Sequence, residues 1–406
     1  MKDEFASRRD IRRKALWAVL FVFIAAGSIW AVFSASKGLS PHDFLLFLKN
    51  ASPIYLSLSL LSMFGFIFFE GLAVRSLIKA FGYPCSVRES MVYGASDIYF
   101  SSITPSATGG QPACAYFMIR NGIPVTMSTV ILLMNLAMYT LAIIVLGTLS
   151  LVTNPGIYQF FAPLGKILII IGFAVQTLLF LSFLLILEKD QWILSFGYFL
   201  IRILHKCHIL RDKPKWDDRL ERHMADYKSY AKLIRSHAKV LWICFFYNFL
   251  QRACQLAVTA FTYLATIAVP GETHLPVTTC ISRALSLFGA QSLISIGATF
   301  IPIPGAMGVT DYMMVDAFRA VIDPERAAAL ALLSRAISFT AVSFFHSSSL
   351  SLHIYGGGKT NDRILRLYRD SDLPVTAVRI HRNYYFPERN WSSVYRYIFP
   401  FVLRSV

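Results

Sequence analysis

Six charged residues lie inside long apolar stretches of the sequence. Three are arginines and three are aspartates, namely Arg252, Arg283, Arg335, Asp97, Asp311 and Asp316. Placing such a charge at membrane depth costs at least about 2.5 to 3.5 kcal/mol, so each invites a functional interpretation. An arginine binds phosphate in a bidentate way and keeps its proton, so one of the three could hold a lipid phosphate halfway across a bilayer. The aspartates could receive a cationic group, or they could pair with the arginines structurally.

Two short motifs of proline followed by glycine repeat along the chain. TPSATGGQP occupies residues 104–112 and IPGAMGVTD occupies residues 303–311. They align at a constant offset that pairs Pro105 with Pro304, Ala107 with Ala306, Gly109 with Gly308 and Arg120 with Arg319. A break of this kind inside a membrane frees backbone groups that lipid cannot satisfy, so the motif lines a cavity or is buried in protein.

Half-helices that begin just after these breaks would direct the positive end of their dipoles inward. The two starts fall near Gln111 and Thr310. A positive helix end suits an anionic group such as a lipid phosphate. A bent structural helix is the alternative interpretation. The candidate substrate-binding residues are therefore Asp97, Pro105, Gly109, Gly110, Gln111, Arg252, Arg283, Pro304, Gly308, Asp311, Asp316 and Arg335.

The elements that carry these residues belong to a membrane protein. Of 406 residues, 55% are hydrophobic and only 15% are charged, against about 25% charged in a soluble domain. This composition excludes a soluble enzyme. The net charge of +16 indicates cytoplasmic loops that face anionic lipid rather than nucleic acid. Six scattered cysteines indicate neither a disulfide framework nor a zinc site, and we expect no cofactor.

Six apolar runs are long enough to span a bilayer. They cover residues 15–35, 53–73, 126–152, 164–187, 240–269 and 327–354. Glu70 and Arg75 fall at the cytoplasmic end of the second run, where we expect a structural role. Two further apolar stretches, residues 90–121 and 276–320, are broken near their middle by proline and glycine.

The distribution of lysine and arginine orients these segments. It places both termini, the loop around Arg88 and the basic loop 188–238 in the cytoplasm. Six spans are consistent with this charge distribution only if each broken stretch enters and leaves the membrane on the same side. The first would do so from the cytoplasm and the second from outside. The sequence thus predicts an all-α polytopic protein of the cell membrane with about six spans and two oppositely oriented re-entrant hairpins, an inverted repeat.

Three regions follow from this topology. Residues 1–14 form a basic cytoplasmic amino terminus, residues 15–356 the membrane domain, and residues 357–406 a basic cytoplasmic tail. The basic loop and the tail carry interleaved aromatic residues, which is typical of helices that lie on an anionic leaflet.

The motifs also resemble a known family. ITPSATGGQPACAYFMIRNGIP at residues 103–124, PIPGAMGVTDYMM at 302–314 and LLSRAISF at 332–339 are similar to the transmembrane region of lysylphosphatidylglycerol synthases and their stand-alone flippase-like relatives. The resemblance implies transfer of a modified phospholipid, such as lysyl-phosphatidylglycerol, to the outer leaflet, and a link to antibiotic resistance. Asp311 stands where the family commonly has glutamate, and Gln111-Pro112 where many members have an acidic residue.

The resemblance leaves the activity open among three classes. The larger members carry a soluble carboxyl-terminal domain that makes the aminoacyl lipid from charged tRNA. Some fifty residues follow residue 354, fewer than a catalytic domain of about 100 to 150 residues needs, so we expect no lysyltransferase activity. A lipid translocator is the leading interpretation, and a small-solute secondary transporter is the alternative. The expected partners are anionic phospholipids and a separate lipid-modifying synthase.

Overall fold

The computed structural model describes residues 49–104, 107–188, 238–267, 275–301 and 308–356, together with residues 42, 202, 303 and 306. The chain divides into two units, Met1–His346 and Ser347–Val406. Every side-chain contact reported below lies within the first unit. The regular elements in the described ranges are all helical, which confirms the predicted all-α class.

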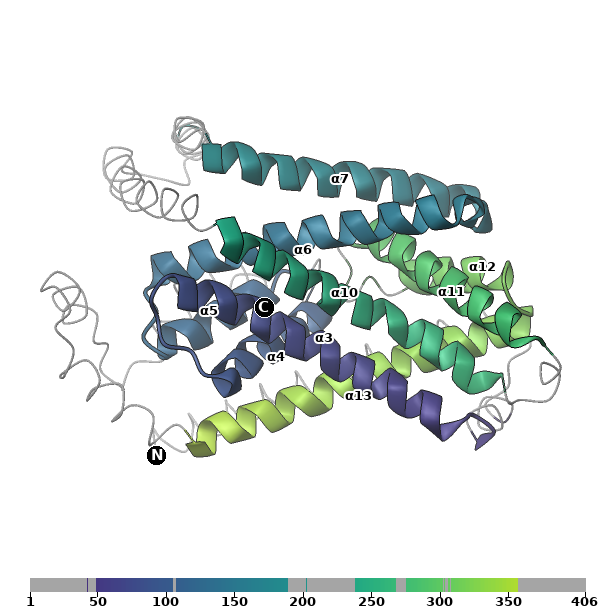
Figure 1. Ribbon diagram of the computed structural model, residues 1–406, viewed down its shortest axis with the longest axis horizontal. Coiled ribbons are helices and arrows are strands. Elements are labelled where there is room, and N and C mark those ends of the chain that lie inside the picture. Colours follow the sequence, from purple (N-terminus) through teal and green to yellow (C-terminus); the bar gives the residue numbers. More distant parts are fainter. Residues whose placement is uncertain are drawn as a thin grey trace, which may run out of the picture. The chain divides into compact units, whose positions relative to one another are not determined.

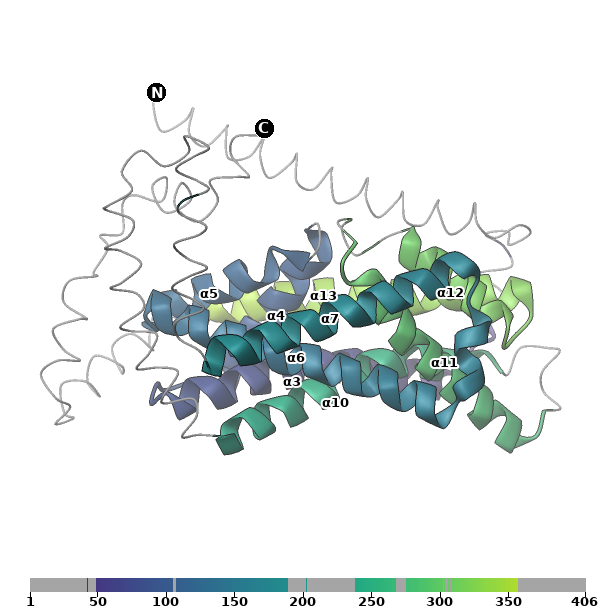
Figure 2. The ribbon, with the colours of Figure 1, turned by 90° about the horizontal axis from the view of Figure 1, so that it is seen from above.

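The described helices follow one another along the chain in this order. They are α3 (Pro53–Ala80), α4 (Val87–Ile103), α5 (Gly110–Arg120), α6 (Val125–Thr153), the 3-10 helix η2 (Pro155–Phe160), α7 (Pro163–Glu188), α10 (Ala238–Thr266), α11 (Val277–Ala298), α12 (Val309–Arg319) and α13 (Pro324–Gly356). Figure 1 shows long helices packed lengthwise, and Figure 2 shows the same bundle from above.

Within the part of the chain that the structure describes, four helices are long and apolar enough to cross a membrane. They are α3, α6, the Pro163–Leu185 part of α7, and α11. The first three confirm helices at the predicted runs 53–73, 126–152 and 164–187. The run 327–354 is helical within α13, and the run 240–269 is helical up to Thr266, where α10 ends. The predicted run 15–35 lies outside the described residues, as does most of the 188–238 loop.

Each of the two broken stretches is a helix, a break and a second helix. Residues 90–121 contain α4 and α5, and residues 276–320 contain α11 and α12. Figures 1 and 2 show the α4–α5 pair and the α11–α12 pair toward opposite ends of the bundle. Helix α11 has 22 residues and could cross a membrane alone, whereas α4 has 17. The re-entrant course and the span count therefore stay predictions.

The structure extends the sequence repeat to the backbone. Helices α5 and α12 both have 11 residues and end at the paired residues Arg120 and Arg319. In both halves the next long helix begins after four residues, at Val125 and Pro324. The paired alanines Ala107 and Ala306 have φ angles of 55° and 48°. Because positive φ is uncommon outside glycine, the same unusual turn in both halves supports a true internal repeat.

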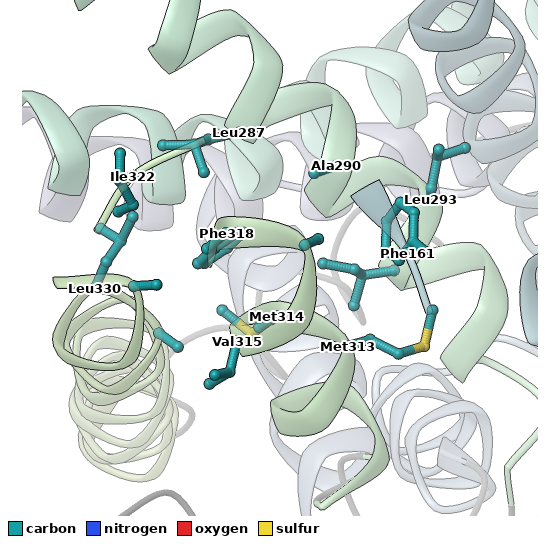
Figure 3. Packing of buried hydrophobic residues seen from close by; sticks show 14 of the residues in the cluster. Phe161, Leu287, Ala290, Leu293, Met313, Met314, Val315, Phe318, Ile322 and Leu330 are labelled. Atoms are coloured by element: carbon teal, nitrogen blue, oxygen red, sulfur yellow. The ribbon is translucent and has the colours of Figure 1, made fainter. Parts of the chain in front are cut away.

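The side chains of the second half meet in a buried apolar cluster. Figure 3 shows Phe318 and Val315 of α12 among residues of α11 and α13, with Phe161 packed nearby. A second cluster joins α3, α4, α10 and α13 and includes Ile67, Val258 and Leu333. Between helices in lipid, close packing rather than exclusion of water holds such clusters together.

Helix α7 presents an apolar face outward. Its exposed large side chains are Leu164, Ile167, Ile170, Ile171, Leu178, Leu179, Leu181, Leu184 and Leu185. A soluble protein rarely leaves so large an apolar surface in contact with water. The face is the one expected for a helix in contact with lipid, and it agrees with a membrane location.

Candidate functional site

A group of buried and half-buried polar side chains lies between four long helices and one short one. We call it the polar cluster: Glu70 of α3, Asp97 of α4, Gln111 of α5, Tyr139 and Asn135 of α6, and Asn248 and Arg252 of α10. Glu70, Asp97 and Arg252 are 2%, 8% and 6% exposed. Since buried charges must be compensated by partners, their contacts decide what the cluster can do.

Glycines let helices α3 and α4 approach closely beside the Glu70 and Asp97 carboxyl groups. A Cβ atom on Gly94 would lie 2.7 Å from the backbone nitrogen of Gly71, and one on Gly71 would lie 2.6 Å from the carbonyl oxygen of Ser90. Small residues permit such close helix contact inside a membrane. Glu70 precedes Gly71, and Asp97 follows Gly94 by less than one turn, so the two carboxyl groups lie within electrostatic reach of each other.

Amide side chains extend the contacts of Glu70 across the bundle. The Asn135 Nδ2 group donates to Glu70 Oε1 at 2.7 Å, and Asn248 Nδ2 donates to Asn135 Oδ1 at 3.0 Å. Asn248 also donates to the Cys244 carbonyl oxygen at 3.0 Å. The chain of hydrogen bonds therefore ties α3, α6 and α10 together through one carboxyl.

Asp97 lies at the amino terminus of the half-helix α5. Its Oδ2 accepts from Gln111 Nε2 at 3.4 Å, and its Oδ1 accepts from the Ser101 hydroxyl at 3.4 Å. A side chain on Gly110 would collide with both Asp97 and Ser101. A carboxylate is favourable at the positive end of a helix. The break at residues 104–109 thus brings the start of α5 onto a buried acid.

Arg252 is the central residue of the 29-residue helix α10. Its guanidinium lies over the ring of Tyr139, with 3.8 Å from Cζ to the ring centroid, and its Nη1 donates to Gln255. Both Glu70 and Asp97 lie within electrostatic reach of the guanidinium. Its Nε–H has no acceptor among the described residues. Tyr139 is likewise central in α6, so the stacked pair lies near the midpoint of both helices.

The second half has its own buried ion pair. Arg335 Nε of α13 lies 2.8 Å from Asp311 Oδ1 of α12. Asp311 Oδ2 accepts from the backbone nitrogen of Gly308 at 2.9 Å, so this carboxylate occupies the amino terminus of its half-helix. Both half-helices therefore begin at an aspartate of the protein itself. At α12 the predicted place for a lipid phosphate is taken by Asp311.

Two predicted site residues lie apart from these groups. Asp316 Oδ2 accepts from the backbone nitrogen of Ala162 at 2.6 Å, directly before α7 begins at Pro163. This contact satisfies a free N–H at a helix start, which is a structural role. Arg283 is half-buried in the first part of α11.

The glycines of the two motifs shape the breaks. Gly109 donates its backbone N–H to Thr104 Oγ1 at 2.8 Å, and a side chain there would strike Thr104. Gly308 has a φ of 81°, a conformation that glycine adopts without strain. Pro105 and Pro304 lie outside the described residues.

Sequence reasoning missed four members of the polar cluster. Helix α3 continues to Ala80, so Glu70 lies ten residues before the end of the helix. Asn135, Tyr139 and Asn248 were missed because they carry no charge, and the sequence argument rested on the cost of burying a charge. The signal was present, since Asn135 and Asn248 both lie inside predicted membrane spans. Among the described residues no group of three possible metal ligands occurs.

Comparison with known proteins agrees with the motifs. A search of curated proteins finds no match. A family model described as lysylphosphatidylglycerol synthase TM region matches residues 16–345. This match covers most of the chain, including both breaks, the polar cluster and the Asp311–Arg335 pair. The chain therefore belongs to the family of the lysylphosphatidylglycerol synthase TM region, a membrane domain linked to the metabolism of this lipid.

Proposed function

We propose that this protein moves a phospholipid between the two leaflets of the cell membrane. The observation that carries the proposal is Arg252, a buried guanidinium at the centre of α10 whose Nε–H has no acceptor among the described residues. An arginine in this state is poised to bind an added anionic oxygen. The family match supports a lipid as the source of that oxygen.

The surroundings of Arg252 suit a phosphate that crosses the bilayer. Stacking on Tyr139 holds the guanidinium plane in place, which favours bidentate binding of phosphate. Asn248 Oδ1, one turn before Arg252 on α10, lacks a partner among the described residues, as does Oε1 of the adjacent Gln251. These acceptors could receive hydroxyl or ammonium groups of a headgroup. A phosphate bound here would lie near the middle of the membrane.

The repeat offers a physical route for alternating access. Inverted repeats in transporters place the binding site between the halves, and rocking of one half against the other exposes it to each side in turn. Here Arg252 comes from α10 of the second half, while Glu70, Asp97 and Tyr139 come from the first. Movement between the halves would therefore open and close the site itself.

A transport assay in liposomes tests the proposal. The full chain would be reconstituted with fluorescent phosphatidylglycerol, lysyl-phosphatidylglycerol, phosphatidylethanolamine or phosphatidylcholine, and leaflet exchange would be followed with an impermeant quencher. We expect faster exchange of at least one lipid, loss of this exchange with Arg252→Met, and normal exchange with Arg120→Met, an exposed arginine at the end of α5. Exchange that is no faster than in protein-free liposomes would refute a translocator and leave a solute transporter as the alternative.

The proposal also implies a supplier of lipid. If the transported lipid is aminoacylated, a separate synthase must attach the amino acid on the cytoplasmic side, where charged tRNA is found. We propose that both termini of this chain face the same compartment. The partner is defined by chemistry alone, as an enzyme that transfers an aminoacyl group to a phospholipid headgroup.

A further inference from the structure

Three buried polar atoms on neighbouring residues of α10 have no hydrogen-bond partner among the described residues. They are Asn248 Oδ1, Gln251 Oε1 and the Nε–H of Arg252. The three residues are 0%, 1% and 6% exposed. Buried polar atoms in native proteins are nearly always paired, so a group of unpaired ones calls for an explanation such as a bound molecule.

The unpaired atom of Asn248 is an acceptor. Its Nδ2 group donates to Asn135 Oδ1 at 3.0 Å and to the Cys244 carbonyl oxygen at 3.0 Å. Neither of these oxygens can donate a hydrogen bond, so turning the amide round would break both bonds. The network therefore fixes the amide so that Oδ1 is the atom left without a donor.

Helical spacing makes the three side chains neighbours. Residues three and four apart lie side by side on a helix, with about 5 to 6 Å between their Cβ atoms, so Asn248 adjoins both Gln251 and Arg252. We call these three residues the α10 subsite. Its unused groups are one cationic donor and two neutral acceptors. A single ligand that paired all of them would need an anionic oxygen and, a few bonds away, a group that donates hydrogen bonds.

We propose that Asn248 and Gln251 select phospholipids whose headgroup carries a hydroxyl or an amine that can donate hydrogen bonds. This selection rests on the proposed function, because it places the lipid phosphate on Arg252. An ionised phosphodiester only accepts hydrogen bonds, so the headgroup beyond the phosphate must supply the donor. A headgroup without a donor leaves both buried oxygens unpaired, and a site of this kind rejects such a ligand strongly.

Two pairs of lipids separate hydrogen bonding from charge. Phosphatidylglycerol and phosphatidylethanol are both singly anionic, but only the first has hydroxyl groups beyond its phosphate. Phosphatidylethanolamine and phosphatidylcholine are both zwitterions, but only the first has N–H groups. Short-chain forms would be titrated into the purified full chain, and their affinities would be obtained from the rise in the thermal unfolding midpoint.

We expect the donor-bearing lipid of a pair to bind at least about tenfold more tightly than its partner. A preference in one pair, with no binding of the other pair, would support selection for that headgroup alone. Equal affinities within a pair that binds, or no binding of any of the four lipids, would overturn the selection.

The variant Gln251→Met separates recognition from folding. Methionine has a similar length and no oxygen. Because Gln251 Oε1 has no partner among the described residues, its loss should not lower the unfolding midpoint of the chain without ligand. We expect the preference within a pair to fall by about fivefold, the effect of one lost hydrogen bond. A lower midpoint with an unchanged preference would assign Gln251 to packing and overturn its role.

The matched control is Gln176→Met in α7. Gln176 is also a buried glutamine, 3% exposed, with an Nε2 atom that has no partner among the described residues. Because it lies on another helix, its replacement should leave the preference between lipids unchanged. A fall in preference equal to that of Gln251→Met would mean that the effect is not specific to the α10 subsite, which would overturn the role of Gln251.

Lipid exchange in liposomes keeps this test distinct from that of the translocator. A binding preference without exchange of any lipid would refute the translocator and support the selection, whereas exchange without a binding preference would do the reverse. Glycerophosphoglycerol, which has the headgroup of phosphatidylglycerol and no acyl chains, is the last probe. If it bound as tightly as short-chain phosphatidylglycerol, the ligand would be a soluble phosphodiester, and selection of a lipid would be overturned.

Discussion

At the residue scale, the charged residues fall into two arrangements with different consequences. Arg335 contacts Asp311 directly, at 2.8 Å, and both side chains are largely shielded from the surface. Arg252 stacks on Tyr139 and keeps one N–H without an acceptor among the described residues. The direct carboxylate partner favours a structural role for Arg335, whereas the neutral Tyr139 ring leaves the Arg252 guanidinium able to bind an anion. The sequence left these two roles open for both arginines.

The Asp311–Arg335 pair should be structural. Replacing Arg335 with Met strands the buried Asp311 carboxylate, which costs on the order of 3 to 5 kcal/mol. The single variant should therefore accumulate poorly in the membrane and unfold at lower temperature in detergent. The double variant Asp311→Asn/Arg335→Met should recover much of the loss, because Asn can still accept from Gly308. A well-folded but inactive Arg335→Met protein would instead assign Arg335 to the substrate site.

Gly110 should be intolerant of any side chain. A methyl group there would collide with Asp97 and Ser101, and overpacking of this kind costs about 1 to 3 kcal/mol. Gly110→Ala should therefore lower the thermal unfolding midpoint and push α5 away from the polar cluster. The control is Gly156→Ala in η2, where the nearest atom to the new Cβ would be Asn154 Oδ1 at 3.6 Å. Equal midpoints for the two variants would contradict this account.

At the scale of elements, the structure separates helices that look alike in the sequence. The two broken stretches share a motif, yet α11 is long enough to cross a membrane and α4 is shorter. Helix α11 contains no proline and no two adjacent glycines before its end at Ala298, so the helix continues up to the second break. Whether α11 and α12 together form a hairpin that returns to its side of entry is a question of topology.

Labelling of introduced cysteines decides that question. Val277 at the start of α11 and Asp323 after α12 are both exposed. If residues 276–320 enter and leave on the outside, an impermeant thiol reagent applied to cells should label Val277→Cys and Asp323→Cys alike. Arg363→Cys in the basic tail should react only after the cells are opened. The unsubstituted chain is the control, and its Cys85 should stay silent because burial raises the pKa of that thiol to about 12.

Labelling on opposite sides would be just as informative. Reaction of Val277→Cys from outside and of Asp323→Cys from inside would mean that α11 crosses the bilayer. The inverted hairpin would then be wrong for the second half of the chain. The repeat of the breaks, which rests on backbone geometry, would be unaffected.

At the scale of the whole molecule, the family match covers residues 16–345. This region contains helices that bury polar groups within the bundle, and the described part of it carries no group of metal ligands. The family description names a synthase, so activity toward lipid must be tested directly.

The chain by itself should not transfer lysine to lipid. Expression in a host that cannot make lysyl-phosphatidylglycerol should leave that lipid undetectable by mass spectrometry of extracted lipids. The positive control is a complete synthase expressed in the same host. Purified chain incubated with lysyl-tRNA and phosphatidylglycerol should give the same negative result. Formation of the lipid in either experiment would show that the membrane domain has catalytic activity.

The sequence by itself determined the class of protein, the helices at three of the predicted spans and the internal repeat. Apolar runs of about 20 residues have one stable form in lipid, because only a helix satisfies its backbone within the segment. The positions of the helix breaks could be predicted equally well, since proline and glycine act locally on the backbone. The constant offset of the repeat then reappeared in the matching turns at Ala107 and Ala306.

Only the tertiary structure decided which polar residues meet. Gly71 and Gly94 let two helices approach beside Glu70 and Asp97, and Asn135, 65 residues later in the chain, donates to Glu70 from a third helix. The partners of Arg335 and Asp316 also come from distant parts of the chain. Arg335 pairs with Asp311, and Asp316 accepts from the backbone nitrogen of Ala162 before α7. Helical periodicity says which face of one helix a residue occupies, but the neighbour of that face depends on how all the helices pack.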